Sequence, residues 1–163
     1  MFFVAGMNTC RTLFAMLYRI ILFILVTFLL RALYAAGMQL HPDEAYYWEW
    51  SRYLDWSYYD QGPGVAFYIK FFTLIFGDTF FALKFAALFG GAVSFYFLYL
   101  SSLELGFSKL KSFLILLITM LLPGYFGGVL FIMHDTPLIL NWSLAFYSTI
   151  RFMRRRETVA LYS

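Results

Sequence analysis

Long apolar stretches dominate this sequence of 163 residues. Hydrophobic residues make up 63% of the chain and charged residues only 13%, whereas soluble domains are roughly 45–50% apolar and about 25% charged. A helix needs about 20 apolar residues to cross a bilayer, and several stretches approach that length. Because backbone groups in lipid must satisfy their own hydrogen bonds, such stretches form helices. The sequence therefore predicts an all-α polytopic membrane protein.

Four transmembrane helices are predicted, and together they use most of the chain as one membrane domain, residues 1–163. The spans cover approximately residues 13–36, 80–100, 112–133 and 136–152. The apolar segment Phe67–Phe76 is too short to cross, so we expect an interfacial or re-entrant helix there.

The first span has an alternative interpretation. Arg11, Arg19, "IILFILVTFLL" and "ALYAAG" resemble the regions of a secretory signal peptide. Arg31 argues against cleavage, because it lies between the apolar run and the cleavage-like segment.

Basic residues indicate the orientation, because cytoplasmic loops carry an excess of lysine and arginine. They occur before the first span, between the second and third, and after the fourth: Arg11, Arg19, Lys109, Lys111, Arg151, Arg154, Arg155 and Arg156. With four spans, both termini and a basic tail at residues 153–163 face the cytoplasm. The loop at residues 37–79 and the turn near residues 123–135 then face outward from the cytoplasmic (inner) membrane.

Two classes of partner and chemistry are disfavoured by composition. The lone cysteine, Cys10, excludes an internal disulfide. The basic residues form no face or run except at the tail, so nucleic acid is not an expected partner. The lipid bilayer is an expected partner.

The outward loop concentrates acids and aromatic rings in "HPDEAYYWEWSRYLDWSYYDQGPG", residues 41–64. Proline followed by two carboxylates is typical of a helix start, so we predict a helix from about Pro42 to Tyr53. That helix would place Asp43, Tyr46 or Tyr47, and Trp50 along one face. An aromatic belt at the lipid headgroups explains the rings, but it explains the adjacent acids less well.

A second acidic site follows the third span in "HDTP", residues 134–137. The four-span topology places Asp135 on the same membrane face as Asp43 and Glu44. Carboxylates at this depth are costly unless they are paired, hydrated or metal-bound. The pattern indicates general base catalysis or a divalent metal; the alternative is that Asp135 only caps the helix that begins near Pro137.

Two blocks carry a family resemblance: "LHPDEAYYWEWSRYLDWSYYDQGPGVAFYIKFFTLIFGD" and "LLPGYFGGVLFIMHDTPLILNWSLAFYSTIRFMRR". From about Leu13 to Arg156 the chain resembles the amino-terminal part of GT-C glycosyltransferases. The most similar group is the bacterial branch of the dolichyl-phosphate-mannose protein mannosyltransferase family, which includes the lipid A aminoarabinose transferase. The resemblance implies transfer of a sugar from a polyprenyl-phosphate donor to a sugar, lipid or protein acceptor on the outer membrane face, with no organic cofactor.

The resemblance also implies roles for individual residues. Asp43, Glu44 and Asp135 match the catalytic acids, and Asp60 and His134 are candidate ligands of a divalent metal ion of unknown identity. The candidate substrate-binding residues are Tyr46, Tyr47, Trp50, Arg52, Tyr59, Gln61 and Lys70. Relatives carry a basic residue at the turn where this chain has Gln61, so Arg52, Lys70 or Arg31 are left to contact the carrier phosphate.

Two further readings stay open. Relatives are several hundred residues long, so we expect a fragment, a truncated reading frame or half of a split enzyme, whose carboxy-terminal half would be a partner chain. The alternative function is a small non-catalytic four-helix membrane protein, such as a carrier, flippase subunit or assembly partner. That alternative predicts polar groups inside the spans, and few are present.

Overall fold

The computed structural model describes residues 2–155, with side-chain surroundings from residue 17 to residue 154. Over these residues the chain forms seven helices and no strand, which confirms the all-α prediction. They are α1 (Phe2–Ala36), α2 (Pro42–Arg52), α3 (Gly64–Phe76), α4 (Phe80–Glu104), α5 (Lys109–Leu121), α6 (Pro123–Gly128) and α7 (Asp135–Arg155). Most of the basic tail predicted for residues 153–163 lies outside the described residues.

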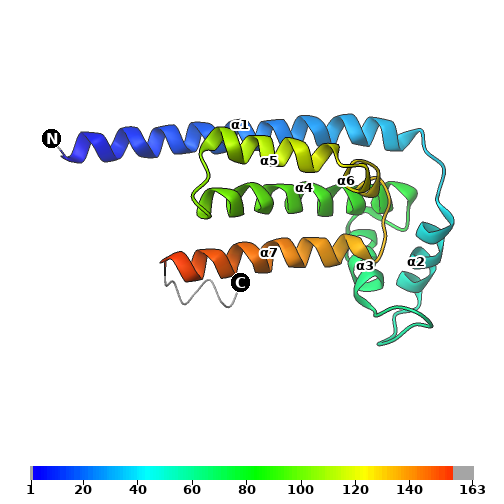
Figure 1. The fold of residues 1–163 in the computed structure, drawn as a ribbon. Coiled ribbons are helices and arrows are strands. Elements are labelled where there is room, and N and C mark those ends of the chain that lie inside the picture. The colour runs from blue at the N-terminus through cyan, green and yellow to red at the C-terminus, as the bar shows by residue number, and fades with distance from the viewer. Residues whose placement is uncertain (1, 156–163) are drawn as a thin grey trace.

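Four helices run lengthwise beside one another, and the three others gather at one end (Figure 1). The lengthwise helices are α1, α4, α5 and α7, and α4 contacts each of the other three. The helices α2, α3 and α6 lie at the end where α1 finishes and α7 begins. The segment between α1 and α4 and the start of α7 therefore share one end of the molecule.

Two of the helical segments are long and apolar enough to cross a membrane, Leu17–Ala36 in α1 and Phe80–Glu104 in α4. The predicted four crossings thus rest on two described helices that meet this criterion. The predicted helix at Pro42–Tyr53 corresponds closely to α2, and the short apolar segment at 67–76 forms most of α3. Their interfacial location stays a prediction.

The segment expected as one span at 112–133 is not a single helix. Helix α5 ends at Leu121, Leu122 is extended (φ −60°, ψ 131°), and α6 starts at Pro123. Proline has no backbone N–H and disfavours the helical conformation of the residue before it. The chain then leaves α6 and reaches α7 through the segment 129–134.

A pair of glycines lets α7 and the segment before it approach α4 closely. A Cβ atom on Gly90 would meet Thr136 Cγ2 at 2.7 Å, and one on Gly91 would meet Val129 Cγ1 at 2.7 Å. Real Cβ atoms do not approach other atoms this closely, so only glycine fits here. The start of α7 is thereby held against α4 near the end that carries α2.

Candidate functional site

The start of α2 is capped from both directions. The Nδ1 atom of His41 accepts a hydrogen bond from the Asp43 N–H (3.3 Å), and Glu44 Oε2 accepts one from the His41 N–H (3.0 Å). This reciprocal capping satisfies donors that a helix N-terminus leaves free. Pro42 occupies the first turn, and the Asp43 side chain remains 59% exposed. Asp43 therefore sits on a rigid helix start with its carboxylate open to the outside.

The neighbouring acid, Glu44, is completely buried. Its oxygens accept hydrogen bonds from Lys84 Nζ at 2.9 and 2.7 Å, and Oε1 also accepts one from the Ile132 N–H at 3.0 Å. Lys84 Nζ also donates to the Leu130 carbonyl at 3.2 Å. The sequence grouped Glu44 with Asp43, but the structure separates them. Glu44 instead joins α2 to α4 and to the segment before α7.

A chain of polar contacts connects α2 to the start of α7. The Tyr47 hydroxyl lies 3.1 Å from His134 Nδ1, and His134 Nε2 lies 3.3 Å from Asp135 Oδ1. Tyr47 is only 6% exposed, whereas His134 and Asp135 face the outside in part. Residues 87 positions apart in the chain thus meet at one surface.

Tyr47 lies in a negatively charged environment. Burial, and then the negative charges of Asp60, Asp43 and Asp135, raise the pKa of Tyr47. Each of these charges disfavours the tyrosinate. Asp43 lies one helical turn before Tyr47 on α2, and Asp135 lies beside the His134 ring that contacts the Tyr47 hydroxyl, so the two acids lie at the same end of the molecule.

The loop after α2 folds back and brings Asp60 to this surface. The Trp50 and Tyr58 rings stack with centroids 4.1 Å apart and an interplanar angle of 4°. The Tyr58 hydroxyl is also 3.0 Å from the carbonyl of Trp50. Tyr46 donates a hydrogen bond to Asp60 Oδ1 at 3.4 Å, and burial together with Asp60 raises the pKa of Tyr46. We call the group Asp43, Tyr46, Tyr47, Trp50, Asp60, His134 and Asp135 the acidic aromatic surface.

The four other predicted substrate-binding residues have different surroundings. Arg52 pairs with Asp78 and with Glu49, each at 3.0 Å; burial lowers the pKa of Arg52, but these two acids raise it overall. Its charge is therefore already compensated. Lys70 is half-buried on α3, Tyr59 is fully exposed, and the Gln61 carbonyl accepts a hydrogen bond from the Tyr58 N–H.

A mainly apolar cavity of about 290 Å³ opens beside Asp135. It lies between α4, α6 and the start of α7, and Gly90, Gly91, Val129 and Thr136 are part of its lining. The glycines that allow α7 to approach α4 therefore also shape this cavity. It gives a nonpolar group room next to a carboxylate.

The two metal ligands suggested by the sequence, Asp60 and His134, each have a partner within the protein. Within residues 17–154, no three His, Cys, Asp or Glu side chains are arranged to hold a metal ion. Asp60 is bound to Tyr46, and His134 lies between Tyr47 and Asp135. The divalent metal ion suggested by the sequence stays a prediction, and we derive no step through it.

Sequence reasoning missed Lys84 and His41 as parts of this arrangement. Lys84 lies one turn into an otherwise apolar helix, and an ionisable group at such a position requires a partner. That rule could have identified Lys84 as the partner of one of the adjacent acids. It could not have decided between Asp43 and Glu44.

Taken together, the fold and the site define a helical membrane protein with acids and aromatic rings at one end. The sequence model of the dolichyl-phosphate-mannose-protein mannosyltransferase family matches residues 60–163. This chain belongs to that family, which is of the GT-C type, and the match supports a GT-C glycosyltransferase-like function. The matched part includes Asp60, His134 and Asp135, and it begins after Asp43. No curated protein and no solved structure matches the chain.

Proposed function

We propose that this chain is a glycosyltransferase, or the amino-terminal part of one, that uses a polyprenyl-phosphate sugar donor. The acceptor is a hydroxyl or amine of a lipid, glycan or protein at the outer face of the cytoplasmic membrane, as in the bacterial branch of the family. The observation that carries the proposal is the 3.1 Å contact between the Tyr47 hydroxyl and His134, which joins the helix that bears Asp43 to the start of α7, where Asp135 lies 3.3 Å from the His134 ring.

In the proposed reaction, Asp43 acts as the general base. Its exposed carboxylate accepts the proton of the acceptor group while the acceptor oxygen or nitrogen attacks the anomeric carbon of the sugar. The bond between that carbon and the phosphate oxygen breaks, and its electron pair leaves with the polyprenyl phosphate. Attack opposite to the leaving group inverts the anomeric carbon. The protein then needs to orient the acceptor more than to activate the leaving group.

Asp135 and His134 supply that orientation. The His134 ring is held by the Tyr47 hydroxyl on one side and by Asp135 on the other. Asp135 is 59% exposed, so it can accept a hydrogen bond from the acceptor beside the apolar cavity. Tyr46 is exposed and offers ring surface to a sugar, and the buried Trp50 ring, whose centroid is 4.6 Å away, supports it from behind.

Glu44 and Lys84 position this machinery and do not take part in proton transfer. Their buried pair ties the helix that carries Asp43 to the segment that leads to Asp135. Since Arg52 is already paired, Lys70 is the cation that we assign to the carrier phosphate among those at this end of the molecule.

The test replaces Asp43 with Asn in the full chain and measures sugar transfer in membranes, using a labelled polyprenyl-phosphate-linked sugar. We expect transfer to be abolished while expression is unchanged, because Asn is isosteric but cannot accept the proton. Asp55→Asn is the matched control: it removes the same charge from the same loop, where Asp55 bonds only locally to the Trp56 N–H. Transfer retained in Asp43→Asn would remove the catalytic assignment.

A further inference from the structure

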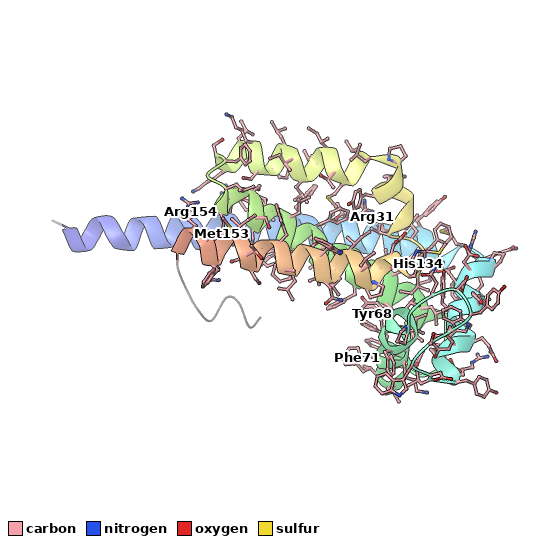
Figure 2. The ribbon with its side chains drawn as sticks, turned by 60° about the horizontal axis from the view of Figure 1, so that its bottom comes forward. Arg31, Tyr68, Phe71, His134, Met153 and Arg154 are labelled. Carbon is pink, nitrogen blue, oxygen red and sulfur yellow. The ribbon has the colours of Figure 1, made fainter. Side chains whose placement is uncertain are left out.

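A second, larger groove lies between α1 and the α5–α6 pair. Its volume is about 560 Å³ and its lining is almost entirely apolar. Its lining includes Phe23, Leu30, Arg31, Leu117, Leu121 and Phe126. Arg31, labelled in Figure 2, is the one charged side chain in this lining. The acidic aromatic surface contributes no residue to it.

The positive charge of Arg31 has no acidic partner in the described structure. Its Nη2 donates to the Met120 carbonyl at 3.4 Å, and its Cζ lies 5.4 Å from the centre of the Phe95 ring. No salt bridge to Arg31 forms within residues 17–154, and the sequences of α1, α5 and α6 contain no Asp or Glu. A charge on a membrane-spanning segment is unfavourable unless it is paired or hydrated.

The contact with Met120 uses only part of the hydrogen-bonding capacity of the Arg31 side chain. That carbonyl belongs to the last turn of α5, where carbonyls lack helical partners and basic side chains are favourable. One of five guanidinium N–H groups is used in this way. The others remain available as a planar fork, which matches the geometry of a phosphate.

Two features indicate that the phosphate comes from the bilayer. Leu30, Leu121 and Phe126 are each more than half exposed, so the groove opens onto the apolar surface that faces lipid. Arg31 lies five residues before the end of α1, about 7.5 Å along the helix axis, which is close to headgroup depth if that end faces outward. Phe95 and Val129 line both the space beside Arg31 and the Asp135 cavity, and so form a wall between them.

We propose that this groove binds one anionic glycerophospholipid, with its phosphate on Arg31 and an acyl chain along Phe23 and Leu117. The lipid fills the space between α1 and α5 and neutralises the arginine. This site is separate from the proposed sugar transfer. It requires only that α1 is embedded in the membrane.

The experiment titrates the full chain, purified and delipidated in a neutral detergent, with phosphatidylglycerol and counts bound lipid by native mass spectrometry. We expect one tightly bound lipid in the wild type and about tenfold weaker binding in Arg31→Gln, because the charge-assisted hydrogen bonds are lost. Glutamine keeps a donor for the Met120 carbonyl, so the end of α5 stays capped. Arg19→Gln is the control: it removes the same charge from the same helix outside the groove, and binding should be unchanged.

A second variant keeps the experiment informative if Arg31→Gln fails to fold. Leu117→Trp fills the groove without touching the charge, and it should also weaken phosphatidylglycerol binding. Equal binding by wild type and Arg31→Gln, or equal binding of uncharged diacylglycerol, would overturn the proposal. Tighter binding of a polyprenyl monophosphate than of phosphatidylglycerol would also overturn it, and would assign the groove to the sugar carrier. None of these measurements depends on sugar transfer.

Discussion

At the scale of single residues, the adjacent acids Asp43 and Glu44 have opposite surroundings. Successive residues on a helix point about 100° apart, since a turn takes 3.6 residues. Asp43 consequently faces outward, and Glu44 points into the contact between α2 and α4, where Lys84 and two backbone N–H groups fill both oxygens. One acid is left free to act on a ligand because the other holds the helix in place.

The buried pair predicts a large effect on stability. Lys84→Met removes the only charge that compensates Glu44 in the described structure, and Glu44 is fully buried. Breaking such a pair by removing one partner costs about 3–5 kcal/mol. We therefore expect a much lower thermal unfolding midpoint in detergent micelles. Lys70→Met, on the half-buried α3 lysine, should shift it far less.

A double variant checks the cause. Adding Glu44→Gln to Lys84→Met removes the unpaired charge and keeps an acceptor for the Ile132 N–H. Stability should then recover in part. No recovery would show that the uncompensated carboxylate is not the source of the loss.

Tyr47 predicts a pH dependence at alkaline pH. Burial, then Asp60 and Asp43, raise its pKa above the ordinary value near 10, so the fold favours the neutral hydroxyl. The stability that this provides is fully present below pH of about 10 and is lost as pH rises through the raised pKa. In an absorbance titration of tyrosinate, Tyr47→Phe should remove one late-titrating group.

Asp60→Asn provides the complementary measurement. Asp60 has the largest effect of the charges that raise the pKa of Tyr47, so removing it should move that late titration toward lower pH. An unchanged titration in both variants would contradict the placement of the carboxylates around this hydroxyl.

At the scale of the elements, the glycine pair of α4 decides how closely α7 and the preceding segment can lie. The break at Leu122–Pro123 has a related effect, since it ends α5 and lets the chain turn toward α4 through α6. Apolar length alone suggested one continuous span at 112–133. Instead, the proline starts the short helix α6, which also contains glycines. The chain then places Val129 against Gly91 of α4.

Gly91→Ala tests this close approach. Its Cβ would lie 2.7 Å from Val129 Cγ1, and the β-branched valine has little freedom to move away. We expect a loss of about 1–3 kcal/mol, measured by thermal unfolding in micelles, and recovery when Val129→Ala is added. Gly128→Ala is the control, since a Cβ there meets nothing within 4 Å. A neutral Gly91→Ala would mean that this contact does not limit the packing.

At the scale of the whole molecule, the functional candidates separate toward one end. The acidic aromatic surface combines α2, the loop after it and the start of α7, whereas Arg154 hydrogen-bonds the Leu103 carbonyl near the opposite end of α4 (Figure 1). The orientation expected from the basic residues, in which acids face outward and basic groups face the cytoplasm, stays a prediction. The Arg31 groove lies between these extremes, along α1.

The sequence by itself determined the helical class and the start of α2. Apolar runs of this length can satisfy their backbone in lipid only as helices, and proline followed by two acids begins a helix wherever it folds. It also placed Asp43 and Asp135 on the same side through the order of charges along the chain. These properties depend on local composition and on the order of charges along the chain. Neither depends on contacts with residues distant in the sequence.

Only the tertiary structure decided which acid is buried, which cation is unpaired and where the helix in the third apolar segment ends. Glu44 is structural because Lys84, 40 residues away, meets it, and Arg52 is unavailable because Asp78 pairs with it. Arg31 keeps an open charge because α1, α5 and α6, which form its groove, carry no acid. Partners that are distant in the chain are set by packing, which spacing along one sequence does not specify.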